Sequence, residues 1–118
     1  KRSMLLPKLF DMVKKGMPIT LQGKSGIKIN PIHVDDASDS ILACLKLNNT
    51  NQTFNIAGPE ILSIKAISKK IGYYLNKKPI FNYENRPSNN VIADISKMKK
   101  FLIKPKKYFS EMLIELDK

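Results

Sequence analysis

Apolar side chains recur every three or four residues in several parts of the chain, which is the spacing of one face of an α-helix. The clearest stripe consists of Ile64, Ile67, Ile71 and Tyr74, and Ser63 is its predicted N-cap. The same spacing predicts four further helices, at about 4–15, 37–45, 96–102 and 109–116.

Short apolar segments between these helices are typical of β-strands. Residues 27–34 are expected to be extended, but Pro31 prevents them from being an ordinary central strand throughout. The 118 residues are enough for one domain with one core. The pattern predicts one small alternating α/β domain over residues 1–118. Its strands are expected within residues 17–23, 53–58 and 79–83.

The chain is strongly basic, with a formal net charge of +11. Such a balance is typical of proteins that bind nucleic acid or other polyanions. Arg2 and Arg86 are the only arginines, however, and arginine is best suited to bidentate contacts with phosphates and bases. The lysines are also spread along the whole chain. A solvated basic surface is therefore favoured over nucleic-acid binding, and a small basic polyanion-binding or nucleic-acid-binding module remains the alternative function.

The composition also bears on the compartment. No apolar run approaches the roughly 20 residues needed to cross a bilayer, so no membrane partner is expected. No signal peptide is visible, and the single cysteine, Cys44, cannot form an internal disulfide, which favours a reducing cytoplasm. The chain begins at Lys1 rather than at methionine, so we expect either a processed protein or a piece of a longer one.

The segment NPIHVDDASDS holds the only histidine and three aspartates. His33 and Asp35 lie two residues apart on an extended segment and could hold a divalent ion, but their spacing matches no specific ligand pattern. A helix N-terminus has unpaired N–H groups and a positive dipole end, and nearby aspartates satisfy both. We therefore predict that Asp35 or Asp36 is the N-cap of the following helix, with no metal site. Contact with a substrate alongside capping stays open.

Two other motifs imitate known sites. Gly23-Lys24-Ser25 ends like a phosphate-binding loop, but the glycine required five positions earlier is Pro18. Tyr73 and Tyr74 each precede a lysine by four positions, which is the Tyr-x-x-x-Lys spacing of a dehydrogenase catalytic pair, but this spacing arises easily in a lysine-rich chain. The sequence has no GxGxxG dinucleotide loop and no GxSxG. No catalytic, cofactor-binding or metal-binding residue is therefore predicted in this chain.

Residues 16–45, 53–81 and 89–105, taken in order, resemble the C-terminal part of the NAD(P)-dependent epimerase/dehydratases, the extended short-chain dehydrogenase/reductase family. The most specific features are the blocks PIHVDD, residues 31–36, and FNIAG, residues 54–58. Members of this family mostly act on nucleotide sugars.

The resemblance implies a substrate-binding domain that forms the C-terminal portion of an extended Rossmann-type short-chain dehydrogenase. NAD or NADP and the catalytic Tyr/Lys pair would belong to an absent N-terminal part. The parent would be an epimerase, dehydratase or reductase. This chain alone would be inactive and would bind nicotinamide dinucleotides weakly at best.

The resemblance also implies four substrate-binding residues. Lys28 stands where many relatives carry an arginine for the substrate diphosphate, and Arg86 stands where a second arginine is common. Asn30 and His33 are expected to orient polar groups of the substrate. If residues 53–58 pair within the large sheet of a parent protein, their edge is exposed in the isolated chain. We therefore expect the chain to self-associate.

Overall fold

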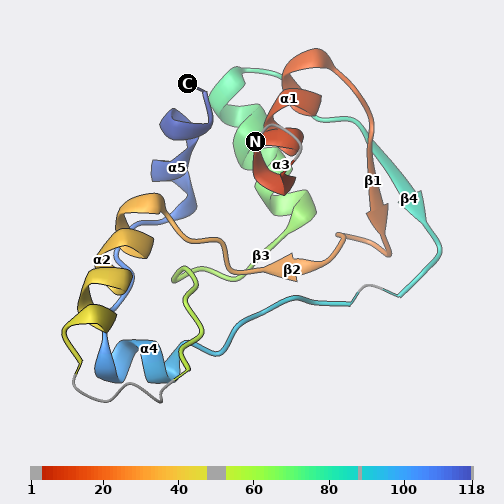
Figure 1. Cartoon of the computed structure of the whole chain (residues 1–118). Helices are drawn as coiled ribbons and strands as arrows, with labels where there is room; N and C mark the ends of the chain where they lie inside the picture. Colours follow the sequence, from red (N-terminus) through yellow and green to blue (C-terminus); the bar gives the residue numbers. More distant parts are fainter. Residues whose placement is uncertain (1–3, 48–52, 88, 118) are drawn as a thin grey trace.

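The computed structural model describes residues 4–47, 53–87 and 89–117, and its described part contains five helices and four strands (Figure 1). In chain order they are α1 (Leu5–Lys15), β1 (Ile19–Gln22), β2 (Lys28–Ile29), α2 (Val34–Leu45), β3 (Leu62–Ser63), α3 (Ile64–Leu75), β4 (Phe81–Glu84), α4 (Ser96–Phe101) and α5 (Phe109–Leu116). The predicted α/β class is confirmed.

The ends of α3 follow from local sequence. The Ser63 side chain accepts a hydrogen bond of 3.1 Å from the backbone N–H of Ala66, as the predicted N-cap requires. The helix stops at Asn76, whose left-handed φ of 54° is tolerated better by asparagine than by most residues. The first helix stops at Gly16 in the same way, with a φ of 69°.

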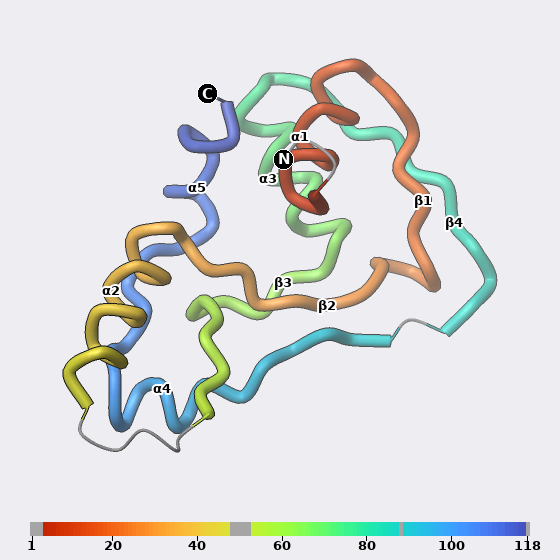
Figure 2. Tube along the Cα trace, in the orientation of Figure 1, coloured from red at the N-terminus to blue at the C-terminus, as the bar shows by residue number. Residues whose placement is uncertain are grey.

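The strands form two small sheets. β1 and β4 pair in parallel, with Ile19 opposite Phe81, and β2 and β3 pair antiparallel, with Lys28 opposite Ser63. A single parallel bridge joins Ile29 to Val91 and brings the segment after β4 alongside β2. Figure 2 shows this segment running beneath β2 toward α4.

The hydrophobic core lies where α1, α3 and α5 meet β1. Full burial of a large apolar side chain in this core contributes about 1.5–3 kcal/mol relative to leaving it in water. The core therefore stabilises one end of the molecule, around β1. It contains Leu9, Phe10, Val13, Ile19, Leu21, Ile64, Ile67, Ile71, Phe109, Met112 and Leu113.

The remainder of the chain extends away from this core. The principal extents are 48 × 33 × 21 Å, and the radius of gyration is 15.8 Å. A compact domain of this length would have a radius of gyration of about 13.5 Å. The difference arises because α2 and α4 lie at the far end from β1 and β4 (Figure 1). No helix in the described part is long and apolar enough to span a membrane.

The strand predicted within residues 53–58 is not formed. Its residues run without a ladder of backbone hydrogen bonds to another strand, although Gly58 donates one of 3.0 Å to the Asn30 carbonyl. A Cβ at Gly58 would stand 1.6 Å from the Pro31 carbonyl oxygen, so this crossing requires glycine. Phe54 and Ile56 are half-buried rather than fully exposed, and the Phe54 ring lies 6.3 Å from that of Phe101.

The predicted N-cap of α2 is also wrong. His33, not Asp35 or Asp36, is the N-cap, because its extended backbone (φ −71°, ψ 144°) lets its ring nitrogen Nδ1 accept the Asp35 N–H at 3.0 Å. Asp35 and Asp36 occupy the first turn instead, where the helix dipole favours negative charge.

The face that α2 buries is the opposite of what its pattern predicts. Asp36 and Ser40 are its buried residues, whereas Ile41 is 56% and Leu45 77% exposed. Cys44 is exposed as well. The apolar stripe of α2 therefore has no core to pack on within the described part of the chain.

Candidate functional site

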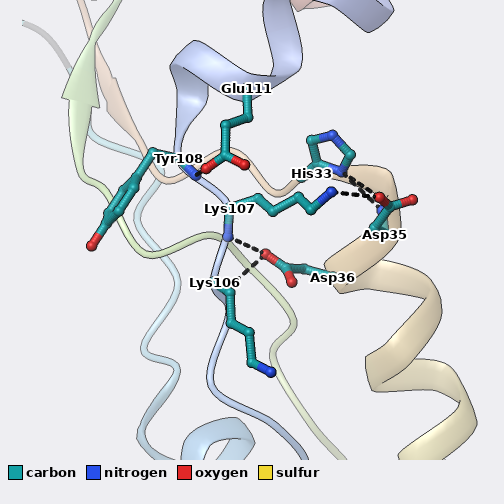
Figure 3. A network of polar contacts seen from close by, with 7 residues as sticks. All are labelled: His33, Asp35, Asp36, Lys106, Lys107, Tyr108 and Glu111. Atoms are coloured by element: carbon teal, nitrogen blue, oxygen red, sulfur yellow. Dashed lines mark hydrogen bonds and ion pairs between the residues drawn. The ribbon is translucent and has the colours of Figure 1, made fainter.

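The acidic block at the start of α2 holds the segment that leads into α5 (Figure 3). One carboxylate oxygen of Asp36 accepts the backbone N–H groups of Lys106 at 2.9 Å and Lys107 at 2.8 Å. The Asp35 carboxylate accepts the Lys107 ammonium at 2.8 Å. This side-chain network fixes two distant segments against each other.

Asp35 and Lys107, which form the exposed ion pair, shift each other's pKa. The hydrogen bond and the charge of Lys107 lower the pKa of Asp35. The hydrogen bond from Asp35 raises the pKa of Lys107. Both groups therefore stay charged over a wider pH range than usual, although solvent screens a pair at the surface.

The N-terminus of α5 receives two further carboxylates. Glu111 accepts the backbone N–H of Tyr108 at 3.1 Å within a capping box, and Glu60 accepts that of Phe109 at 2.7 Å. Because these groups satisfy N–H donors that a helix leaves unpaired, they direct α5 onto the core. Glu60 directly follows the Gly58-Pro59 turn, and nothing in the sequence near it indicates that it caps a helix 49 residues further along.

Asn30 joins β2 to the segment after β4. Its side-chain amide donates to the Ala93 carbonyl at 2.8 Å, and its side-chain oxygen accepts the Ala93 N–H at 3.1 Å. The Asn90 side chain similarly accepts the backbone N–H of Lys28 at 3.0 Å, and Val91 donates to the Lys28 carbonyl at 2.9 Å. Residues 90–93 are thus held along β2 by four hydrogen bonds.

Lys28 and Arg86 lie close to these hydrogen bonds between β2 and residues 90–93. Lys28 is an exposed residue of β2, and its backbone is bonded to Asn90 and Val91, while Arg86 stands only four residues before Asn90. Arg86 is 64% exposed and pairs with Glu84 at 3.4 Å. The structure brings these two cations onto adjoining segments without burying either of them.

Two surface grooves border the segment between β4 and α4. One, of about 530 Å³, follows the end of β4, and there the Lys65 ammonium lies 5.1 Å from the centre of the Tyr83 ring. The other, of about 690 Å³, is lined partly by Asn30 and Ala93. Lys65 could not be recognised from the sequence as part of this groove, because its neighbours Tyr83 and Lys24 come from other parts of the fold.

His33 faces a different part of the molecule. It is 5% exposed and lines an apolar pocket of about 520 Å³ between the start of α1 and the end of α5. The described residues therefore do not gather Lys28, Asn30, His33 and Arg86 around one cavity. They also contain no group of three potential metal ligands.

Comparison with known proteins shows which class of protein this chain resembles. No protein-family model matches the chain. Its structural neighbours include UDP-sugar 4-epimerases, one of them solved in complex with UDP-glucuronic acid and NAD, and these match nearly the whole chain. The resemblance found in the sequence is confirmed, and the Rossmann-like α/β fold with it.

Particular relatives make this similarity concrete. UDP-glucuronic acid 4-epimerase from Bacillus cereus, solved in complex with NAD, matches with a TM-score of 0.82 and 24% identity over 99% of this chain. UDP-N-acetylglucosamine 4-epimerase from Bacillus cereus matches with a TM-score of 0.76 and 23% identity over 98%. A curated Escherichia coli protein, dTDP-4-dehydro-6-deoxyglucose reductase, is 23% identical over 96 residues, which is 79% of this chain.

The matched region is a minor part of each relative. The chain spans 39% of the length of both epimerases and 30% of the reductase. An activity of the whole relative therefore cannot be assigned to these 118 residues from the similarity.

Proposed function

We propose that this chain is the C-terminal, substrate-binding portion of an NAD(P)-dependent epimerase, dehydratase or reductase that acts on a nucleotide sugar. The observation that carries the proposal is the match of nearly the whole chain to about two-fifths of nucleotide-sugar epimerases. We place the parent enzyme in the cytoplasm, in keeping with a single, exposed cysteine.

The shape of the chain supports a missing remainder. Its radius of gyration exceeds that of a compact domain of equal length, and the apolar stripe of α2 is exposed at Ile41 and Leu45. Residues 53–58 also pair with no strand among the residues that the structure describes. In the proposed parent, these surfaces pack on the N-terminal portion, which removes apolar area from water.

Lys28 and Arg86 are the proposed diphosphate ligands. Both are exposed cations on adjoining segments, so a dianion can approach them without displacing a buried partner. Arg86 would bind through its planar guanidinium, while Lys28 would act as a point charge. Binding would compete with the weak, exposed contact between Arg86 and Glu84.

Hydrogen bonds within the protein restrict what Asn30 and His33 can contribute to substrate binding. The Asn30 amide is engaged with Ala93, so we assign it to holding the segment between Arg86 and α4 in place. The His33 nitrogen Nδ1 caps α2, so its proposed contribution is to fix the path of the chain beside the substrate. If either residue contacts the substrate directly, we propose that it does so through hydrogen-bonding groups that do not take part in these bonds.

The residues present do not fit a nicotinamide dinucleotide. The chain has five glycines, none of them in a GxGxxG arrangement. The connection from β2 to α2, residues 30–33, contains no glycine that would let the backbone approach a pyrophosphate at the helix N-terminus. We therefore assign the cofactor and the catalytic Tyr/Lys pair to the remainder of a longer protein. Chain 1–118 by itself is proposed to be inactive.

Calorimetric titration with UDP- and dTDP-sugars tests this function in the full-length protein that carries the chain. Replacing Lys28 or Arg86 by glutamine removes one charged hydrogen bond to phosphate, so Kd should rise roughly 10- to 100-fold for each variant. Lys104→Gln, an exposed lysine beyond α4, is the matched control and should bind normally.

Two outcomes would contradict the proposal. The reading frame upstream of Lys1 could lack a dinucleotide loop, which would remove the enzyme class. Alternatively, the Lys28 and Arg86 variants could both bind the sugar nucleotide as tightly as the Lys104→Gln control. That result would exclude Lys28 and Arg86 as diphosphate ligands, but it would not exclude the proposed enzyme class.

A further inference from the structure

Two loops meet at the end of the molecule opposite α2 and α4. The loop from α1 to β1 and the loop from α3 to β4 lie together at the top of Figure 1. The Ile19 N–H donates to the Ile80 carbonyl at 2.8 Å, and the Lys77 ammonium donates to the Lys14 carbonyl. This end of the molecule is therefore one continuous surface built from two distant parts of the sequence.

Carboxylates are absent from the sequence stretches that build this surface. Residues 12–20 carry two lysines and residues 69–80 carry four, and neither stretch contains an aspartate or a glutamate. Asp117, at the end of α5, bonds the Tyr74 hydroxyl at 3.3 Å and bounds the surface on that side. Asp11 lies one turn before Lys14 on α1. In residues 12–20 and 69–80, lysine is thus the only charged residue type.

Apolar side chains stand exposed among the lysines. Tyr73 is 92% exposed and lines a shallow groove with Lys69, Lys77 and Lys78. Met17 and Ile80, on the two loops, are each about half exposed. We name this surface the apical patch and define it as Lys14, Lys15, Met17, Tyr73, Lys78 and Ile80.

We propose that the apical patch docks the protein onto an anionic lipid surface. Lysines are attracted by the negative potential of a charged leaflet, and each gains roughly fivefold in partitioning when it lies near that surface. Tyrosine, methionine and isoleucine side chains gain by entering the boundary between headgroups and acyl chains. Attachment of this kind needs no spanning segment.

The same side chains suit nucleic acid less well. Aliphatic side chains such as Met17 and Ile80 make no contact with phosphates, and the patch lacks arginine, which forms the bidentate contacts typical of base and phosphate recognition. An anionic lipid membrane has charged headgroups that attract the three lysines and an apolar interior that accommodates Met17, Tyr73 and Ile80. Nucleic acid is therefore the outcome against which the lipid proposal is tested.

Co-sedimentation of the purified protein with vesicles tests the proposal. Phosphatidylcholine vesicles containing phosphatidylglycerol should bind the protein, vesicles of phosphatidylcholine alone should bind it far less, and high salt should release it. The triple variant Lys14→Gln, Lys15→Gln and Lys78→Gln should lower partitioning on the order of a hundredfold.

Matched variants separate the patch from the overall charge. Replacing Lys99, Lys104 and Lys106 by glutamine changes the net charge equally at exposed positions on the other side of the fold, and should lower partitioning far less. Ile80→Ser should weaken binding, whereas Ile61→Ser, which removes a similarly exposed isoleucine elsewhere, should not. Far-ultraviolet circular dichroism of every variant would confirm that each one is folded.

Three results would overturn the proposal. They are equal losses in the two triple variants, equal binding to neutral and anionic vesicles, and tighter binding of single-stranded or duplex nucleic acid with the same dependence on the patch lysines. Nucleotide-sugar affinity should be unaffected by all patch variants, so failure here is distinguishable from failure of the proposed substrate site.

Discussion

The carboxylate of Asp36 accepts a hydrogen bond of 2.8 Å from the backbone N–H of Lys107, which lies 71 residues further along the chain. The same oxygen accepts the N–H of Lys106, and Asp36 is only 3% exposed. A buried carboxylate that accepts two backbone donors is a strong tie, because its removal leaves both donors without a partner.

Asp36→Ala should lower the free energy of unfolding by about 2–4 kcal/mol, because it removes two charge-assisted hydrogen bonds and leaves two backbone N–H groups unpaired. Urea denaturation followed by circular dichroism measures this. Asp39→Ala, at an exposed position of the same helix, should change the stability by less than about 0.5 kcal/mol. Equal effects of the two substitutions would show that the tie to Lys106 and Lys107 contributes nothing.

Asn30→Asp should loosen the segment held along β2. An aspartate can still accept the Ala93 N–H, but it presents an oxygen where the Asn30 amide donated to the Ala93 carbonyl. We expect faster hydrogen exchange at residues 91–94, with an opening free energy lower by about 1–2 kcal/mol. Asn82→Asp, an equal charge change on the exposed face of β4, is the control. Unaltered exchange at residues 91–94 would refute the role given to Asn30.

The pair of Asp35 and Lys107 should make stability depend on pH at both extremes. The lowered pKa of Asp35 means that its contribution is complete above the usual pKa of 3.8 and is lost as the pH falls through the lowered value. The raised pKa of Lys107 means that its contribution is complete below 10.5 and is lost as the pH rises through the raised value.

Thermal unfolding across this acid range checks the sign. The Tm of the unmodified protein should fall more steeply below pH 3.8 than that of Asp35→Asn, which lacks the titrating carboxylate. Asp39→Asn should follow the unmodified protein. Because the pair is exposed, high salt should reduce the difference, and parallel curves at low salt would exclude a linked contribution.

Features set by neighbouring residues could be predicted from the sequence. The stripe of Ile64, Ile67 and Ile71, together with its Ser63 cap, is a local pattern, and the structure forms α3 as expected. The cap of α2 was predicted two or three residues too late, because the choice depends on which residue has an extended backbone where the helix begins. That residue is His33, whose ring can accept an N–H as a carboxylate can.

Features set by distant partners could not be predicted. Nothing near Asp36 in the sequence indicates that its acceptors face Lys106, and nothing near Asn30 indicates Ala93. The strand expected at residues 53–58 has the right composition, but a strand exists only where another strand offers hydrogen bonds. The proposed substrate residues Lys28 and Arg86 were chosen by resemblance, and their adjoining placement became visible only in the fold.

The exposed stripe of α2 leads to the last prediction, that chain 1–118 self-associates when it is studied without a larger parent. Ile41 and Leu45 are more than half exposed, and neighbouring Leu42 is 56% exposed, so pairing of two such stripes removes apolar area at about 25 cal/mol per Å². Sedimentation velocity over a range of concentrations should show a shift to larger species. The double variant Ile41→Lys and Leu45→Lys should remain monomeric.

Ile61→Lys with Ile114→Lys provides the control for that variant. It adds the same charge at two isoleucines that are 57% and 60% exposed outside α2, so general repulsion alone would affect it equally. We expect this control to associate like the unmodified chain. Association that persists in the α2 variant would move the contact to residues 53–58, which pair with no strand in the described part of the chain. A clean monomer at high concentration in the unmodified chain would contradict self-association by either surface.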